Sequence, residues 1–416
     1  MEITITFLTP TFLYGADQTR PEFRIPSLIG QMRYWWRMTQ KWGDSSNIAN
    51  MREEESKIFG LSDKGAKSFC LWVTDKKGLT EQQATQPQSG QPHGSRQQAR
   101  QYMYDTNRGS GLSYFFYPFN QSRREKFSWF APQASVQLEM DFLKKENKPQ
   151  VLLSLFLLSC FGGLGARSRR GAGAMEVSLA GCDLFNTVPE HPPEEYLLRY
   201  VRGEDRKTFH EYFSLIHDDS PLRQALSRPG TRYCRFQPVS GADPLRVLGS
   251  LGTKMQCFRT KYKLLDPTAP LGEVHPDFRG EASALHGYYN DFCKPHGTCS
   301  PPPRLSKDAF GLPRIINFST GRPVSNALTI APFAADGETG RRASPLHITV
   351  NRRKDGNGHR YHATLLVLWD GLDFLPDDDS LPIRIKHQQN GVPTSYPTLE
   401  NPGPEKLELF MKEALS

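Results

Sequence analysis

The sequence predicts an α+β fold with a ferredoxin-like N-terminal part and long insertions. Strand-like and helix-like segments follow one another in the order β-α-β-β-α-β over the first 180 residues, which is the ferredoxin-like order. Strand patterns return near residue 315 and indicate a second α+β unit. Because 416 residues are enough for two domains, we expect one over residues 1–180 and another over residues 181–416.

The first half of the N-terminal pattern holds two expected strands and one helix. Apolar and polar residues alternate over residues 1–8, which predicts a strand. Ser27 has the chemistry of a helix N-cap, and the apolar stripe behind it predicts a helix to about residue 41. A second strand is expected over residues 69–74. Residues 75–100 are rich in Gln, Ser, Pro and Gly, which predicts a disordered insertion.

The second half of the pattern begins with an expected strand pair over residues 111–119 and 133–143. The apolar segment 149–161 predicts a helix, and residues 175–179 predict the last strand. Between these two elements lies a segment rich in glycine and arginine, residues 162–174.

The remainder of the chain is expected to mix helices, a long loop and short strands. The expected elements are helices near 193–227 and 242–258, a Pro- and Gly-rich loop over 266–305, strands at 315–318, 346–350 and 361–369, and a helix at 406–415.

Charge and composition narrow the class of protein. A formal net charge of +8 favours a polyanionic partner without naming it. The chain has no run of about 18 apolar residues, so we expect no membrane span, and its first residues do not resemble a secretory signal. Seven widely spread cysteines are typical of a reduced protein. We therefore expect a cytoplasmic protein that has no membrane contact and needs no cofactor.

The segment 162–174 is the first candidate binding element. Its five glycines, Gly165 and Gly171 among them, let the backbone approach a ligand closely. Arg167, Arg169 and Arg170 surround Ser168 with positive charge. The amides and guanidiniums of such a loop can wrap a phosphodiester backbone, and a solvated turn is the alternative. A dinucleotide fingerprint does not fit, because that loop follows a strand and opens a helix.

A second candidate is the stretch around the first expected helix. Arg33 and Arg37 are four residues apart and share one helix face, and aromatic residues occupy the neighbouring face. Arginine beside aromatic rings suits single-stranded RNA, although at least one of the two tryptophans is expected in the core. The candidate RNA-binding residues here are Arg24, Ser27, Arg33, Tyr34, Trp36 and Arg37.

Two further groups stand in the second half of the chain. Arg314, Arg341 and Arg342 precede expected strands, where arginines suit phosphate, and a solvated basic turn explains them equally well. A Cys/His cluster offers metal-ligand spacing, but structural zinc sites usually combine two separated pairs of ligands. A loop with unpaired thiols is therefore favoured over zinc. The cluster consists of His286, Cys293, His296 and Cys299.

These motifs, taken in order, resemble the RAMP superfamily of CRISPR proteins, and within it the double-RAMP head subunits of type III-B Cmr effector complexes. The resemblance rests on Leu8–Asp17, Arg24–Arg37, Ile58–Gly60, Gly162–Gly173, Phe310–Pro313 and Arg341–Leu346. It implies two ferredoxin-like, RRM-like domains and a glycine-rich loop that faces RNA.

The resemblance also implies partners and a role. The partners would be a guide RNA, a complementary target RNA and other RAMP subunits. The protein would bind near the 3′ part of the guide RNA and help capture the target for antiviral defence. By position, the RNA path would be lined by Arg24, Arg33, Arg37, Arg167, Arg169, Arg170, Arg341 and Arg342.

Some RAMP proteins cut RNA, so an endoribonuclease is the alternative function. Guide processing without a metal needs a histidine or tyrosine as general acid or base, but all eleven histidines lie at or after His93. A target-cutting subunit would use a loop aspartate, for which Asp17 is the candidate. Capping, or pairing with Arg20 or Arg24, is the favoured role of Asp17. We expect a non-catalytic subunit.

Overall fold

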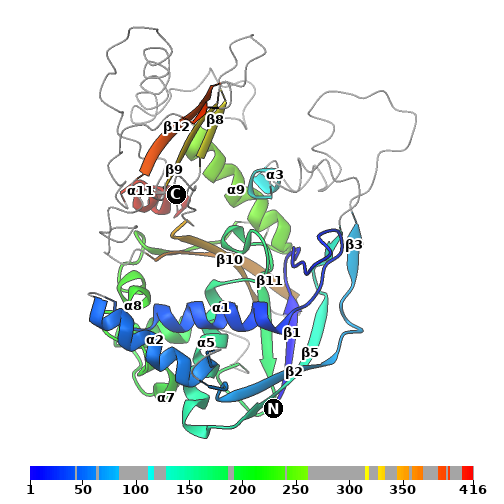
Figure 1. Ribbon diagram of the computed structural model, residues 1–416, viewed down its shortest axis with the longest axis vertical. Helices are drawn as coiled ribbons and strands as arrows, with labels where there is room; N and C mark the ends of the chain where they lie inside the picture. The colour runs from blue at the N-terminus through cyan, green and yellow to red at the C-terminus, as the bar shows by residue number, and fades with distance from the viewer. Residues whose placement is uncertain are drawn as a thin grey trace. The chain divides into compact units, whose positions relative to one another are not determined.

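The computed structural model describes the chain in fourteen stretches (Figure 1). They are residues 1–42, 45–61, 65–83, 111–116, 128–185, 192–238, 241–260, 314–317, 327–332, 344–355, 358–368, 383–389, 392–393 and 405–415. By spatial contact the chain forms two compact units. The first comprises Met1–Met255, His347–Leu368 and Met411–Ser416, and the second comprises Gln256–Leu346 and Trp369–Phe410.

The first sheet confirms the ferredoxin-like prediction for the N-terminal part. Its strands are β1 (Glu2–Phe7), β2 (Phe69–Asp75), β5 (Ser135–Phe142) and β6 (Met175–Leu179). They lie in the order β2-β5-β1-β6, and every neighbouring pair is antiparallel. Strand β1 is one of the two central strands and pairs with β5 on one side and with β6 on the other. The α+β class is therefore confirmed.

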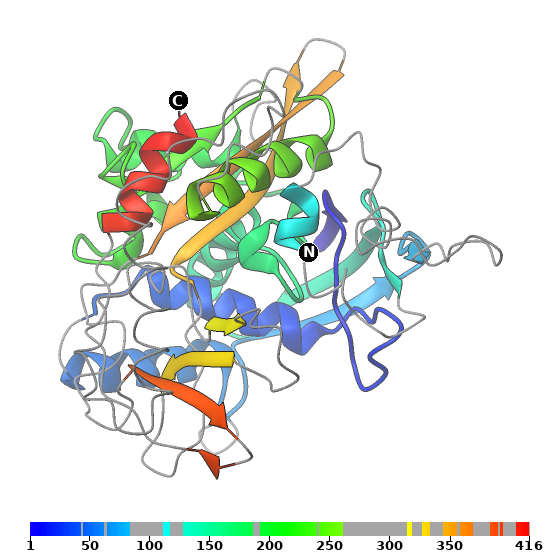
Figure 2. The same ribbon diagram turned by 90° about the horizontal axis from the view of Figure 1, so that it is seen from above.

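Two helices cover one face of this sheet. Helix α1 (Ile25–Met38) buries an apolar stripe that packs on α5 (Lys148–Phe161) and includes Trp35, whose ring centroid is 5.9 Å from that of Phe161 (Figures 1 and 2). From Val151 to its last residue, α5 is buried on all sides, because it also contacts β6, α7 and β11. A helix enclosed in this way needs an apolar sequence on every face, which is what its residues provide.

The structure corrects the expected start of the first helix. Helix α1 begins at Ile25, the N-cap is Arg24, and no side chain caps the helix, so Ser27 is not the cap. Pro26 in the first turn explains the earlier start, since proline needs no backbone hydrogen-bond donor there. Helix α2 (Ser45–Phe59), which the sequence did not predict, follows and packs against α1.

The predicted strand over 111–119 is wrong in its described part. Residues Gly111–Phe115 form helix α3, which lies beside α9 (Pro244–Thr260) in both views (Figures 1 and 2). Gly111 and Gly252 make this approach possible, because a Cβ atom at either position would meet the backbone of the other helix. Residues 81–83 of the predicted insertion form β3 (Glu81–Gln83), which pairs with β4 (Ser128–Phe130); residues 84–100 lie outside the described stretches.

The rest of the first unit carries a second sheet in the order β10-β11-β7. Its strands are β7 (Tyr233–Phe236), β10 (Leu346–Asp355) and β11 (Gly358–Val367). The helical region expected near 193–227 consists of the three short helices α6 (Pro193–Val201), α7 (His210–Phe213) and α8 (Pro221–Leu226).

The second unit contains a sheet in the order β13-β12-β9-β8. These strands are β8 (Arg314–Asn317), β9 (Ala327–Pro332), β12 (Ile383–Gln389) and β13 (Val392–Pro393), and α11 (Glu405–Leu415) follows as predicted. The division at residue 180 and a second ferredoxin-like domain stay predictions. No helix in the described stretches has the length and apolarity to cross a membrane.

Candidate nucleic-acid interface

The segment that joins α5 to β6, residues 162–174, is called here the glycine–arginine loop. It is fixed by hydrogen bonds to the segment that follows β1. The amide of Ala166 donates to the carbonyl of Phe12 (2.8 Å), and the amide of Gly173 donates to that of Pro10 (2.9 Å). The buried hydroxyl of Thr9 donates to the carbonyl of Gly171 (2.7 Å) and accepts from the amide of Ala174 (3.0 Å). The loop is therefore held in one conformation.

Glycine is required where the loop crosses this segment. Gly165 has φ of +88°, and a Cβ atom there would lie 2.5 Å from the carbonyl oxygen of Phe12. Both the backbone angle and the close approach exclude a side chain. The glycines therefore bring the backbone onto the segment that follows β1, and the three arginines of the loop are half-buried.

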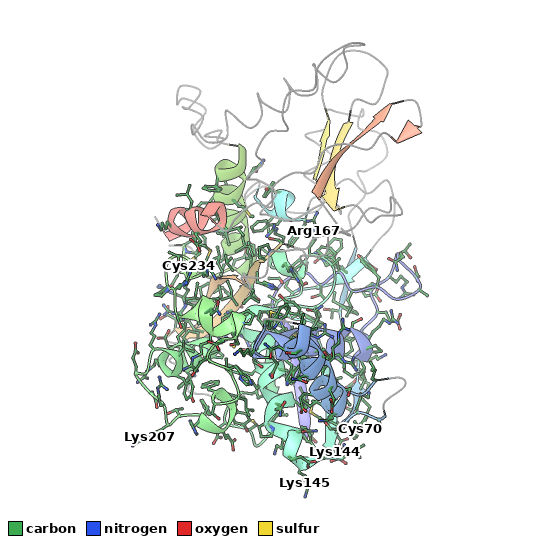
Figure 3. The ribbon with its side chains drawn as sticks, turned by 60° about the vertical axis from the view of Figure 1, so that its left-hand side comes forward. Cys70, Lys144, Lys145, Arg167, Lys207 and Cys234 are labelled. Atoms are coloured by element: carbon green, nitrogen blue, oxygen red, sulfur yellow. The ribbon has the colours of Figure 1, made fainter. Side chains whose placement is uncertain are left out.

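Arg167, which precedes the short 3-10 turn of the loop, has an unusual backbone conformation. Its φ of +62° lies in the left-handed region, and a turn of 3-10 helix over Ser168–Arg170 follows it. Desolvation lowers the pKa of its guanidinium from the ordinary value, while the group stays charged. Among the described residues no carboxylate pairs with Arg167, which Figure 3 labels on the ribbon. A half-buried cation that has no carboxylate partner in the described part of the chain is suited to receive an anion.

Arg169 lies on the face of an aromatic ring. Its guanidinium carbon is 5.2 Å from the ring centroid of Tyr34 on α1. Tyr34 also contacts His347 on β10: the two ring centroids are 5.4 Å apart in a stacked arrangement, and the tyrosine hydroxyl lies 2.8 Å from Nε2 of His347. This stack joins the glycine–arginine loop, α1 and β10, three parts distant in the sequence.

The strand β10 continues this connection along the loop. After His347, the Thr349 hydroxyl donates to the carbonyl of Gly162 (2.7 Å), and the Asn351 amide donates to that of Cys160 (3.0 Å). Alternate residues of a strand share one face, so one side of β10 supports the start of the loop. Sequence reasoning missed His347 and this support, although the alternation at 347, 349 and 351 was a usable signal.

Burial lowers the pKa of His347 well below its ordinary value, and the charges of Arg169 and Arg170 act in the same direction. The ring is therefore neutral at neutral pH, and its Nε2 is already engaged by Tyr34. In this arrangement His347 positions the stack and has no free nitrogen at Nε2 to exchange protons with a substrate.

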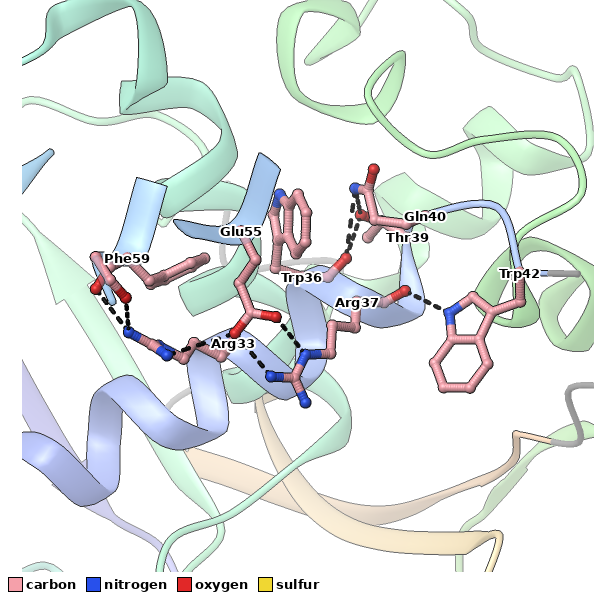
Figure 4. Close-up of polar contacts among 9 residues, drawn as sticks. Arg33, Trp36, Arg37, Thr39, Gln40, Trp42, Glu55 and Phe59 are labelled. Carbon is pink, nitrogen blue, oxygen red and sulfur yellow. Dashed lines mark hydrogen bonds and ion pairs between the residues drawn. The ribbon is translucent and has the colours of Figure 1, made fainter. Parts of the chain in front are cut away.

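Arg33 and Arg37 hold α2 in place (Figure 4). The guanidinium of Arg37 makes two hydrogen bonds to Glu55, of 2.6 and 2.7 Å. Arg33 donates to the carbonyl of Phe59, the last residue of α2 (2.7 Å), and to that of Gly60, which follows it (2.5 Å). The Glu55 side chain is only 6% exposed, so its charge has to be compensated within the protein. These two guanidiniums act as structural contacts to α2.

The remaining helix candidates divide by burial. Trp36 is 2% exposed, and its indole donates to Gln150 (2.8 Å), so it is a core residue and cannot stack on a base, which corrects that expectation. Tyr34 is half-buried within its stack. Arg24 is exposed at the start of α1, and Ser27 is half-buried in its first turn.

The open face of the first sheet is unsuited to RNA. Some RNA-binding sheets of this topology stack bases on aromatic residues. Here Glu2 of β1 stands directly opposite Glu139 of β5, and Asp141 is exposed farther along β5. Trp72, 41% exposed, lies across from Glu139 on β2. These carboxylates repel phosphate, so the glycine–arginine loop is the better candidate.

Residues 4–176 match the family model of the RAMP superfamily. This match covers the N-terminal part of the chain, which is similar there to the RAMP superfamily. The chain is also 27% identical over 184 residues to the CRISPR system Cmr subunit Cmr1-2 of Pyrococcus furiosus, and that match covers 41% of this chain and 91% of that relative.

Solved structures also match. The crystal structure of Cmr1 from Pyrococcus furiosus in its apo form has a TM-score of 0.47 and 15% identity, and the match covers 100% of this chain and 96% of that one. A cryo-EM structure of the type III-B Cmr-beta complex bound to cognate target RNA contains a chain with a TM-score of 0.48 and 10% identity, with 100% and 98% covered.

The loop aspartate, Asp17, caps its own turn. One Asp17 carboxylate oxygen accepts from the amide (2.7 Å) and the hydroxyl (2.6 Å) of Thr19. The side-chain hydrogen bond from Thr19 is the main reason why the pKa of Asp17 is lowered. The capping role expected from the sequence is what these contacts show.

Several predicted residues cannot be placed. Arg314 starts β8, but its side chain is outside the description, and Arg341, Arg342, His286, Cys293, His296 and Cys299 lie outside the described stretches. Within those stretches no group of three or more His, Cys, Asp or Glu residues could hold a metal ion.

Proposed function

We propose that this protein is a non-catalytic, RNA-binding subunit of a type III-B CRISPR effector complex in the cytoplasm. The relationship to the Cmr subunit of Pyrococcus furiosus supports membership of such a complex. Its partners are then a guide RNA, a complementary target RNA and other RAMP subunits. It acts near the 3′ part of the guide RNA and helps capture the target. Because base pairing supplies the sequence specificity, the protein needs to bind only the RNA backbone.

The main observation that supports RNA binding is the environment of the Arg167 guanidinium. A partly desolvated guanidinium without a carboxylate partner in the described residues stands on a loop that hydrogen bonds hold rigid. An ordered guanidinium pairs with a phosphate at a low entropic cost. The residues we assign to this contact are Gly165, Arg167, Ser168, Arg169, Arg170 and Gly171, with the exposed Arg24.

The contacts of Asp17, the candidate catalytic residue, and of the buried His347 favour a binding role over cleavage. Asp17 is held by Thr19, and Nε2 of His347 faces Tyr34 in the core of the stack. A general acid or base has to reach the proton that it transfers. These engagements support the non-catalytic assignment.

The test is a pull-down of the tagged protein from its native host, with bound proteins and RNA identified. Recovery of other RAMP subunits with short repeat-derived RNAs is the expected result. Recovery of the protein alone, or with unrelated RNA, would contradict the proposal. Asp17→Ala in the assembled complex is expected to leave RNA cleavage unchanged; loss of cutting with assembly intact would overturn the non-catalytic role.

A further inference from the structure

A cavity of about 250 Å³ lies beside β6, apart from the arginines of the glycine–arginine loop. Its walls come from the end of β1, from α5, from β6 and from the hairpin of β10 and β11. One part is apolar and the other is basic. The apolar wall contains Leu8, Phe156, Met175, Val177, Leu184 and Phe185.

The basic part of the cavity comes from three consecutive cations on β10 and from His359 on β11. Arg352 forms an ion pair with Glu176 on β6, and this pair fixes the hairpin against the first sheet. Arg353 is half-buried and Lys354 is exposed. Neither of them pairs with a carboxylate in the stretches that the structure describes, so two positive charges remain at the cavity.

The other polar groups of the cavity are satisfied within the protein. The Asn351 amide donates to Cys160 and to the hydroxyl of Thr364, and the Ser159 hydroxyl donates to the carbonyl of Phe156 (2.7 Å). A ligand therefore meets an apolar wall, the two cations and the exposed His359. A group that matches the wall and the cations has a flat apolar part joined to an anion.

We infer that this cavity binds one nucleotide, with the phosphate on Arg353 and Lys354 and the base against the apolar wall that includes Phe185. Pockets for drug-sized ligands measure about 300–1,000 Å³, so a site of this size admits about one nucleotide. Basic side chains bind the phosphate, and aromatic rings accept any base face. The site does not depend on the glycine–arginine loop, so its test is separate from that of the proposed function.

The direct test is calorimetric titration of the full chain with uridine 5′-monophosphate and, separately, with inorganic phosphate. We expect the nucleotide to bind the wild type more tightly than phosphate does. Replacement by Arg353→Glu and Lys354→Glu together should weaken nucleotide binding at least about tenfold, because two cations become anions. The matched control reverses the exposed pair Lys144 and Lys145, which Figure 3 shows well separated from Arg167, and should bind as the wild type does.

The inference is overturned if the wild type does not bind the nucleotide, or if the Arg353/Lys354 variant binds it as the control does. Arg353→Gln with Lys354→Gln, which only neutralises the charges, repeats the test should the reversal impair folding. Phe185→Ala is expected to weaken binding of the nucleotide and to leave that of phosphate unchanged. Equal weakening of both would contradict the placement of the base.

A second experiment distinguishes a nucleotide that belongs to an RNA strand from a free nucleotide. Affinity for a ten-nucleotide single-stranded RNA is measured by fluorescence anisotropy against salt. If the site holds a nucleotide of a strand, the Arg353/Lys354 neutralised variant lowers the salt slope by about 0.7, since the contact to one phosphate is lost. If the site holds a free nucleotide, the slope stays unchanged while the titration with uridine 5′-monophosphate still shows the loss.

Discussion

Replacing Arg167 by glycine and by alanine separates the conformation of the loop from its charge. At a φ of +62° a residue with a Cβ atom costs about 1–2 kcal/mol relative to glycine. Glycine loses more backbone freedom on folding than alanine does, which favours the alanine variant by about 0.4–1 kcal/mol. We therefore expect Arg167→Gly to be more stable than Arg167→Ala by about 0.5–1 kcal/mol, the reverse of the usual order of these two residues in folded chains.

Both variants should lose RNA affinity to the same extent, because both lack the guanidinium. A hydrogen bond to a charged group contributes about 1.5–3 kcal/mol, which corresponds to a loss of about 10- to 100-fold at low salt. Urea unfolding of the full chain measures the stability, and fluorescence anisotropy with a single-stranded RNA measures the affinity. The reasoning is refuted if alanine is the more stable variant, or if either variant binds RNA as the wild type does.

Three further predictions test the framework around the loop. Thr9→Val removes a buried hydroxyl that makes two hydrogen bonds to the loop, so it should lower the free energy of unfolding in urea by about 1–3 kcal/mol and weaken RNA binding. Thr9→Ser keeps the hydroxyl and should have neither effect. Equal effects of the two variants would contradict the role of the hydroxyl. Glu55→Gln removes the negative charge that pairs with the partly exposed Arg33 and Arg37, so it should lower the free energy of unfolding by about 1–3 kcal/mol without changing RNA affinity. A loss of affinity as large as that of Arg167→Ala would indicate that these two arginines contact RNA. Because the pKa of His347 is lowered in the folded chain, the unfolded chain binds a proton below about pH 6.5 that the folded chain does not. The free energy of unfolding should therefore fall as the pH drops from 7 to 5, by up to about 1.4 kcal/mol per pH unit. His347→Gln should flatten this dependence, and an unchanged slope would argue against a neutral ring.

Elements with a clear periodicity were predicted from the sequence alone. The alternation at the start of the chain and the apolar run of α5 each allow one secondary structure, and both predictions hold. The run at 111–119 is short and apolar, a pattern that fits strand and helix equally. In its described part it forms a helix that packs closely against Gly252 through Gly111, a contact across more than a hundred residues that no local pattern reveals.

The candidate site was predicted in part for a similar reason. The glycine–arginine loop is visible because its residue types are concentrated in one segment. The roles of Arg33 and Arg37 depend on Glu55, which belongs to a helix that the sequence did not predict. Arginine spacing on a helix face cannot tell an acidic neighbour in the fold from a phosphate. The cations on β10 were missed because their importance depends on the cavity beside β6.

The central claim is that this protein binds RNA phosphates through the glycine–arginine loop. The most direct test is the salt dependence of single-stranded RNA binding by the wild type, by a variant with Arg167, Arg169 and Arg170 all replaced by alanine, and by the Lys144→Ala, Lys145→Ala control. Three lost phosphate contacts should lower the slope of log affinity against log salt by about 2, while the control keeps the wild-type slope. A loop variant that keeps the wild-type slope and affinity would contradict the claim.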